Sequence, residues 1–170
     1  AEETAVAWEA RLDLAVHQAE QADWLAALPA SAAVAHRPLR IWLKVDTGMH
    51  RLGLDPAEVP HLQARLADCP VVATGPGLLT HLANADEPAD PFTDLQCQPL
   101  RALAQPGQAL NIGNSAGILA SPAARADWVR PGIMLYGGSP LNDRGAAALG
   151  LRPVMTLKTQ VSATHVYRAG

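Results

Sequence analysis

One stretch of this sequence carries the side chains that are best suited to chemistry. It reads Lys44-Val45-Asp46-Thr47-Gly48-Met49-His50-Arg51-Leu52-Gly53 and follows an apolar segment. Arginine can grip a carboxylate through two parallel hydrogen bonds, so Arg51 is a candidate for holding an acidic group of a ligand. Lys44 and Asp46 could instead form a solvated salt bridge on one face of a strand. Lys44 and Lys158 are the only lysines of the chain, so chemistry that needs a lysine amine has two candidates.

Two further segments have the pattern of an anion site. Asn114-Ser115-Ala116-Gly117 is expected to follow a strand and open a helix, where N–H groups and a hydroxyl could surround a phosphate. The same four residues also fit an ordinary Asn or Ser helix N-cap. Arg130-Pro131-Gly132-Ile133 places a permanent cation beside a turn whose N–H groups could bind a second anion oxygen or an aromatic nitrogen.

Histidine and cysteine give less specific signals. His81, which we expect at the end of a strand, could relay a proton or be a hydrogen-bonded histidine of the core. Cys69 and Cys97 lie 28 positions apart, with neither a CxxC pair nor a Cys/His cluster at metal-ligand spacing. They therefore predict reduced core thiols and no metal site.

The order of elements along the chain predicts a parallel sheet. Short β-rich runs alternate with helical stretches at roughly thirty-residue intervals, which is typical of βα units. The predicted strands are 12–16, 39–45, 78–82, 109–112 and 133–136, and 71–77 could be a further short strand. The predicted helices are 18–28, one that opens with a capping box at Asp55-Pro56-Ala57-Glu58, one that begins near Asp90-Pro91, and one that starts at Asn114-Ser115, while 31–38 is an Ala-rich linker.

Polar residues follow every predicted strand. In parallel α/β folds the functional groups collect at the carboxyl ends of the strands, although strand ends that meet solvent are polar in any case. Arg130 precedes the last predicted strand. The polar residues after the strands are His17, Lys44, Asp46, Arg51, His81, Asn84, Asn111, Asn114, Ser115 and the segment Gly137-Gly138-Ser139.

The pattern changes after residue 150. From Met155 onward apolar and polar residues alternate, which predicts a half-buried strand of the antiparallel type. A lone strand cannot satisfy its own hydrogen-bond ladder. We therefore expect residues 1–150 to form one domain, residues 151–170 to begin a β-rich domain, and the sequence to be part of a longer chain.

The composition limits the classes of function. The chain has 170 residues, of which 49% are apolar and 17% charged, with a net charge of −3. This acidic balance argues against a nucleic-acid or membrane-docking surface. No segment approaches the run of about 18 apolar residues that a membrane helix needs. The charged residues near the start do not fit a signal peptide, so we expect a cytoplasmic protein.

Five blocks of the sequence together resemble the bacterial alanine racemases. They are LKVDTGMHRLG (43–53), LLTHLANADEP (78–88), NSAGIL (114–119), DWVRPGIMLYGGSP (127–140) and LRPVMTL (151–157). The resemblance implies a partial (β/α)8 TIM-type barrel that binds pyridoxal 5'-phosphate, with the first strand of a C-terminal β-domain. It also implies a homodimer that interconverts L- and D-alanine through an external aldimine of the cofactor.

The resemblance also implies roles for the residues of the cofactor site. Ser115, with the backbone of Asn114, Gly132 and Ile133, would hold the cofactor phosphate. Arg130 would donate to the pyridine nitrogen, which then stays unprotonated because arginine does not give up its proton. This arrangement would favour racemisation over transamination.

Three further roles concern the substrate and the protons. His81 would be a relay between Arg130 and a catalytic tyrosine. Arg51 would bind the substrate carboxylate and the phenolic oxygen of the cofactor. Lys44 matches a lysine that is carbamylated in many family members, and the resulting anion would hold Arg51 in place.

Two blocks of the family do not occur here. The Schiff-base lysine belongs to an AVVKADAYGHG-like segment and the opposing tyrosine to a GYG-rich stretch, so the 170 residues alone are expected to be inactive. His50 replaces a commoner small residue, and Gly113 and Gly117 replace alanines. The alternatives are a racemase of another small amino acid, a non-catalytic barrel of the pyridoxal-phosphate homeostasis type, and a phosphosugar barrel enzyme. A strand-rich domain after Gly170 would separate the racemases from the last two.

Overall fold

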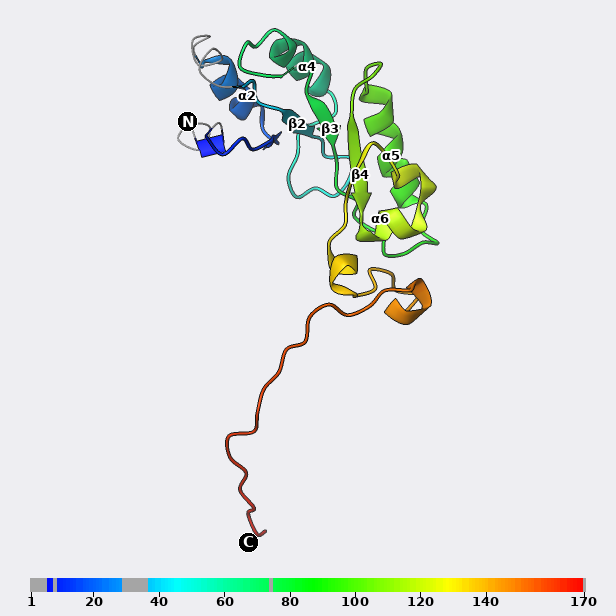
Figure 1. Ribbon diagram of the computed structural model, residues 1–170. Coiled ribbons are helices and arrows are strands. Elements are labelled where there is room, and N and C mark those ends of the chain that lie inside the picture. The colour runs from blue at the N-terminus through cyan, green and yellow to red at the C-terminus, as the bar shows by residue number, and fades with distance from the viewer. Residues whose placement is uncertain (1–5, 8, 29–36, 74, 170) are drawn as a thin grey trace.

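A sheet of five parallel strands forms the centre of the computed structural model, which describes residues 6–7, 9–28, 37–73 and 75–169 (Figure 1). Each strand pairs with the next one along the chain. This order is that of consecutive strands in a (β/α)8 barrel. The strands are β1 (Leu14–Val16), β2 (Ile41–Lys44), β3 (Gly77–Leu79), β4 (Leu110–Asn114) and β5 (Trp128–Arg130).

Helices follow the strands and cover one face of the sheet (Figure 1). Alternate sheet residues such as Ile41, Leu43 and Leu78 are completely buried, and they belong to the same core as Leu62 and Leu66 of a helix. The α-helices are α2 (Ala19–Ala26), α4 (Val59–Ala67), α5 (Phe92–Leu103) and α6 (Ser115–Ala120), and the 3-10 helices are η1 (Pro122–Ala124), η2 (Ile133–Tyr136) and η3 (Ala146–Leu149).

The last predicted strand of the sheet, 133–136, is wrong. These residues form the 3-10 helix η2, and the strand is β5, which ends at Arg130. Pro131 has no N–H and ends the ladder. The N–H groups of Gly132 and Met134 then point to the hydroxyl of Ser115, at 2.7 and 3.5 Å, and not to β4. Arg130 consequently lies at the carboxyl end of a strand.

The helix predicted at Asp55 begins later than expected. The reciprocal contacts are present, because Asp55 Oδ1 accepts from Ala57 N at 2.8 Å and Glu58 Oε2 accepts from Asp55 N at 3.2 Å. They close a turn, and α4 begins only at Val59. Pro60 explains the delay, because it has no N–H to donate to the carbonyl of Pro56, and Val59 N instead donates to Pro56 at 3.4 Å in a tighter turn.

The other predicted starts agree more closely with the structure. Helix α5 begins at Phe92, whose N–H donates to Asp90 at 2.9 Å. Helix α6 begins at Ser115 as predicted. The possible strand at 71–77 includes residue 74, which lies outside the described residues. Among the others, Val72 forms a single bridge with Leu39, and Gly77 begins β3. Most of the linker predicted at 31–38 lies outside the described residues.

The strand predicted from Met155 is not formed in this structure. Residues 151–169 have no assigned strand, are almost all exposed, and run away from the sheet (Figure 1). The physical reason is that no described strand lies beside them to share a ladder. The division of the chain at residue 150 stays a prediction. None of the described helices is long and apolar enough to span a bilayer.

We expect Gly77→Ala to destabilise the sheet. Gly77 is paired with Trp42, and a Cβ on Gly77 would lie 2.5 Å from the indole Cε3. Forcing the indole aside should cost about 1–3 kcal/mol of unfolding free energy, measured by urea titration. Gly145→Ala is the control, because a Cβ there meets no heavy atom within 4 Å. Equal stability of the two variants would contradict the tight contact.

Candidate active site

The predicted site residues lie along one edge of the sheet. The strand register pairs Lys44 with Leu79, and Asn114 with Arg130. Thr80 and His81 follow β3 directly. The expectation that polar residues meet at the carboxyl ends of the strands is therefore correct for β2, β3 and β4. At β5 the polar residue is Arg130, and not the segment 137–139 that the sequence predicted.

Arg130 is fixed by oxygen atoms of the two preceding strands. Its Nη2 donates to the carbonyl oxygens of Thr80 at 2.6 Å and Ile112 at 3.4 Å, and its Nη1 donates to the carbonyl of Asn111 at 3.2 Å. The side-chain oxygen of Asn111 accepts a further bond from Nη1. Burial lowers the pKa of Arg130, yet a guanidinium keeps its charge. No carboxylate forms an ion pair with it among the described residues.

Four basic side chains interact electrostatically at this edge, namely Lys44, Arg51, His81 and Arg130. The pKa of Lys44 is lowered by burial, then by the charges of Arg130 and Arg51, and Asp46 opposes this only in part. The pKa of His81 is lowered by burial and then by Arg130, Arg51 and Lys44. His81 is therefore neutral near pH 7, and the edge has an excess of positive charge that favours an anion.

Asp46 is turned toward its own loop and does not form the alternative salt bridge with Lys44 that the sequence allowed. Its Oδ1 accepts from the N–H groups of Gly48 and His50, both at 3.0 Å, and its Oδ2 lies 3.2 Å from His50 Nδ1. Burial would raise the pKa of Asp46, but these bonds from His50 and Gly48 lower it on balance. His50 takes a positive φ of 55°, which is uncommon for a non-glycine residue.

The Ser115 hydroxyl faces the turn after β5. Ser115 is only 5% exposed, and its Oγ accepts from Gly132 N at 2.7 Å. Ile133 is the first residue of η2, so its N–H has no acceptor within that helix. A hydroxyl and several N–H groups thus meet at one point.

Asn114 is an N-cap, which is the simpler of the two interpretations of its segment. Its Oδ1 accepts from Gly117 N at 2.9 Å, and its Nδ2 donates to the carbonyl of Leu82 at 3.5 Å. Its side chain is therefore used within α6, and its backbone remains beside Ser115.

A cavity of about 330 Å³ connects these groups. Small-molecule sites are usually clefts of about 300–1,000 Å³ with a few polar groups. Lys44 and Arg51 do not line this cavity. The lining residues are His81, Asp86, Asn114, Ser115, Ala116, Arg130, Gly132, Ile133 and Pro140.

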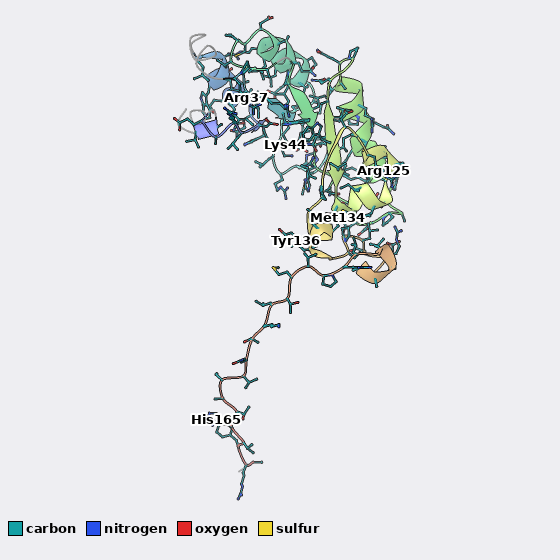
Figure 2. The ribbon with its side chains drawn as sticks, viewed as in Figure 1. Arg37, Lys44, Arg125, Met134, Tyr136 and His165 are labelled. Carbon is teal, nitrogen blue, oxygen red and sulfur yellow. The ribbon has the colours of Figure 1, made fainter. Side chains whose placement is uncertain are left out.

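Other polar residues of the sequence prediction lie elsewhere or have structural partners. Asn84 donates to Asp90 at 2.9 Å, and the Ser139 hydroxyl lies within hydrogen-bond distance of two backbone carbonyls, those of Leu141 and Arg144, to one of which it donates. Lys158 belongs to the exposed C-terminal segment, on which Figure 2 also shows His165. Among the described residues, no group of three or more His, Cys, Asp or Glu could hold a metal ion.

Sequence reasoning missed Thr80 and Gln96. Gln96 is completely buried in α5, where its Oε1 accepts from Ala83 N at 2.8 Å and its Nε2 donates to the carbonyl of His81 at 3.3 Å. It thereby holds the segment that carries His81. The available signal was its spacing, because Gln96 lies on the same helix face as Thr93 and Leu100 and a polar residue on a buried face needs partners.

Comparison with known proteins identifies the family. Residues 1–140 match the family described as alanine racemase, N-terminal domain. The alanine racemase of Thioalkalivibrio sulfidiphilus is 53% identical over 159 residues, which are 91% of this chain and 42% of that protein. The biosynthetic alanine racemase of Pseudomonas aeruginosa is 45% identical over 162 residues, which are 95% of this chain and 44% of that protein. The chain thus spans less than half the length of these relatives.

Solved structures agree with the fold. The crystal structure of the biosynthetic alanine racemase from Pseudomonas aeruginosa gives a TM-score of 0.80 at 45% identity and covers 89% of this chain and 41% of that chain. The alanine racemase from Acinetobacter baumannii gives 0.76 at 33% identity and covers 90% of this chain and 42% of that chain. With the parallel sheet, these matches confirm the predicted partial (β/α)8 barrel.

In the complete protein we expect Lys44 to carry a carbamate or to lie against a bound anion. Its lowered pKa leaves more of the amine neutral than in an ordinary lysine, and a neutral amine attacks carbon dioxide and loses a proton to give an anion. Because protonation blocks this attack, the carbamate should disappear as the pH falls. Carbon-13 NMR in labelled bicarbonate measures it, with Lys44→Arg as the control. A bare ammonium with no anion beside it would contradict the expectation.

Proposed function

This chain belongs to the alanine racemase N-terminal domain family, and from that membership we propose that its complete form is a pyridoxal 5'-phosphate-dependent alanine racemase. One observation supports the proposal best. The Ser115 hydroxyl with its neighbouring N–H groups, which could bind a phosphate, and the fixed cation Arg130 line the same cavity. A phosphorylated pyridine needs an anion cup and a donor for its ring nitrogen at opposite ends, and these residues fit both needs.

The phosphate would be held by Ser115, the N–H groups of Gly132 and Ile133, and the backbone of Asn114. Gly132 is suited to this position because a Cβ there would lie 3.7 Å from Ser115 Oγ, in the space that the phosphate needs. Once bound, the cofactor supplies an electron sink that makes the α-proton of an amino acid acidic.

Arg130 would donate to the pyridine nitrogen. Its carbonyl partners on β3 and β4 keep the guanidinium in place, and its permanent charge prevents transfer of its proton to the ring. His81, which is kept neutral by burial and by the neighbouring cations, can accept or donate a proton beside Arg130. Arg51 would bind the substrate carboxylate, and a carbamate on Lys44 would orient Arg51.

The complete protein is further proposed to be a cytoplasmic homodimer. Cys69 and Cys97 are buried free thiols, as expected for a reducing compartment. A racemase of another small amino acid is the runner-up, because the roles proposed for Arg51, Arg130 and Ser115 concern the substrate carboxylate and the cofactor. These roles would be the same for any small amino acid.

The 170-residue chain by itself should form no covalent adduct with the cofactor. Lys44 does not line the cavity and Lys158 lies on the exposed C-terminal segment, so neither amine is placed to react. Borohydride reduction with pyridoxal phosphate, followed by peptide mapping, tests this. Racemisation by the chain alone, or a stoichiometric pyridoxyl group on either lysine, would overturn the assignment.

The complete activity can be tested in a chimera, called here the completed protein. In it, this chain replaces the matching region of the Thioalkalivibrio sulfidiphilus relative, so that the remaining segments of that protein are supplied. We expect it to racemise alanine, measured by chiral chromatography of the product. Failure to racemise by a chimera that folds and binds the cofactor would count against the proposal.

Reversing the charge at Arg130 should change the reaction and not only slow it. In the completed protein, Arg130→Glu would let the pyridine nitrogen be protonated, so pyruvate formation by transamination should rise relative to racemisation. Arg125→Glu is the matched control, because Arg125 is exposed and its Nε donates to the carbonyl of Ile118 (Figure 2). An unchanged product ratio in Arg130→Glu would argue against the assigned role.

A further inference from the structure

Thr80 contacts both the loop that carries Arg51 and the side chain of Arg130. The residue lies directly after β3 and is 1% exposed. Its hydroxyl faces the loop 45–54, which carries Arg51, whereas its carbonyl accepts from Arg130. We propose that Thr80 is a positioning residue for substrate binding, because its hydroxyl anchors this loop. The proposal rests on the proposed function, in which Arg51 binds the substrate carboxylate.

The hydroxyl of Thr80 has a defined hydrogen-bond direction. It donates its one proton to the carbonyl of Val45 at 3.0 Å. The 2.8 Å contact with Thr47 Oγ1 must then be donated by Thr47, because a hydroxyl has one proton and two acceptor lone pairs. Thr80 therefore engages the loop at its first residue and again two residues later.

Hydrogen bonds within the loop 45–54 hold its two ends together and fix its interior. At its base, Asp46 N donates to the carbonyl of Leu54 at 2.9 Å, and Leu54 N donates to the carbonyl of Lys44 at 2.8 Å. Inside, the Asp46 carboxylate holds the N–H groups of Gly48 and His50. These bonds fix the shape of the loop. Its place on the sheet is fixed by the Val45 N–H, which donates to the carbonyl of Leu79 at 2.8 Å, and by the Thr80 hydroxyl, which also reaches Thr47 inside the loop.

A second contact of the loop is apolar. Gly48 lies against the ring of Phe92 in α5, where a Cβ on Gly48 would be 2.8 Å from the ring Cζ. A ring contact of this kind has no hydrogen-bond direction and permits sliding. The two hydrogen bonds of Thr80 therefore add a defined direction to the way the loop is held, and with it to the position of Arg51.

The change Thr80→Val separates these two roles. Valine has nearly the same shape as threonine and keeps the carbonyl that binds Arg130, but it leaves the buried carbonyl of Val45 without the Thr80 donor. A buried polar group that loses its partner drives local rearrangement. We expect the loop to shift and Arg51 with it, while Arg130 keeps its bond to the carbonyl of residue 80.

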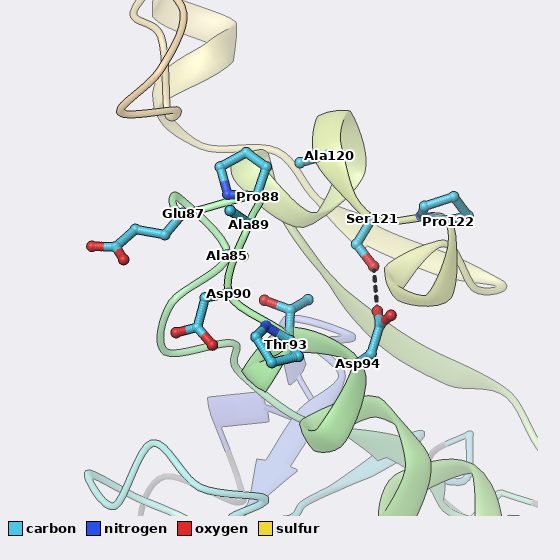
Figure 3. A pocket seen from close by; sticks show the side chains of 11 residues that line it. Ala85, Glu87, Pro88, Ala89, Asp90, Thr93, Asp94, Ala120, Ser121 and Pro122 are labelled. Carbon is cyan, nitrogen blue, oxygen red and sulfur yellow. Dashed lines mark hydrogen bonds between the residues drawn. The ribbon is translucent and has the colours of Figure 1, made fainter.

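A natural control lies in the next helix. Thr93 of α5 is 6% exposed, and its Oγ1 has no hydrogen-bond partner among the described residues. It lines a separate small cavity of about 140 Å³, in which Figure 3 shows it beside Asp90 and Asp94. Thr93→Val makes the same chemical change at an equally buried residue, but it breaks no bond.

The experiment compares Thr80→Val, Thr80→Ser and Thr93→Val in the completed protein. Thr80→Val should raise the KM for alanine about tenfold and change kcat by no more than about twofold, because the bonds it removes orient substrate binding. Thr80→Ser keeps the hydroxyl and should restore most of the affinity, and Thr93→Val should leave KM unchanged.

A second readout does not depend on racemisation. Amide hydrogen exchange in residues 46–53 should be about fivefold faster in Thr80→Val than in the parent protein and unchanged in Thr93→Val, because the loop loses its anchor. Thr47→Val removes the hydrogen bond between Thr47 and Thr80 from the side of the loop. It replaces Thr80→Val in this experiment if Thr80→Val does not fold.

The outcomes separate this proposal from the proposed function. A completed protein that folds but does not racemise alanine contradicts the function, and loop exchange still tests the anchor. Equal KM values and equal exchange in Thr80→Val and Thr93→Val would overturn the positioning role.

Discussion

The buried guanidinium of Arg130 is the group on which the rest of the site depends. It binds carbonyl oxygens at the ends of β3 and β4 and the side chain of Asn111, so it ties three neighbouring strands together where they end. Its charge also lowers the pKa of both Lys44 and His81. A cation that is half-buried and held only by neutral acceptors makes its surroundings selective for anions and for neutral bases.

The loop 45–54 completes this electrostatic arrangement. Asp46 could have neutralised Lys44, but it is used to shape the loop through Gly48 and His50. The positive charges of Lys44 and Arg51 therefore remain available to a ligand or to a modification of the lysine. The same loop is attached to β3 through Thr80, whose carbonyl binds Arg130. In the proposed function, the groups for the substrate and for the cofactor are thus coupled through Thr80, directly after β3.

Where prediction from sequence failed, a proline or a missing partner was responsible. Pro131 and Ser115 convert the apolar run 133–136 into a 3-10 helix, although its composition is that of a strand. Pro60 delays α4 even though the capping contacts at Asp55 form. The alternation after Met155 indicates a strand, but a strand exists only where another strand shares its hydrogen bonds. The local preference of each of these segments was therefore overridden by a proline or by the absence of a neighbouring strand.

The sequence by itself determined the parallel βα order, the polar residues Lys44 and His81 at the ends of β2 and β3, and the start of α6, because these follow from patterns along the chain. It placed Arg130 before a strand, and the tertiary structure placed it at the end of β5. Only the tertiary structure decided which polar atoms meet. It assigned Asn114 to a cap and Ser115 to the turn at Gly132, and it revealed Thr80 and Gln96 as supports. The bonds of Ser115, Thr80 and Gln96 join residues that are far apart in sequence. Such partners are set by how strands and helices pack, and no local pattern encodes that packing.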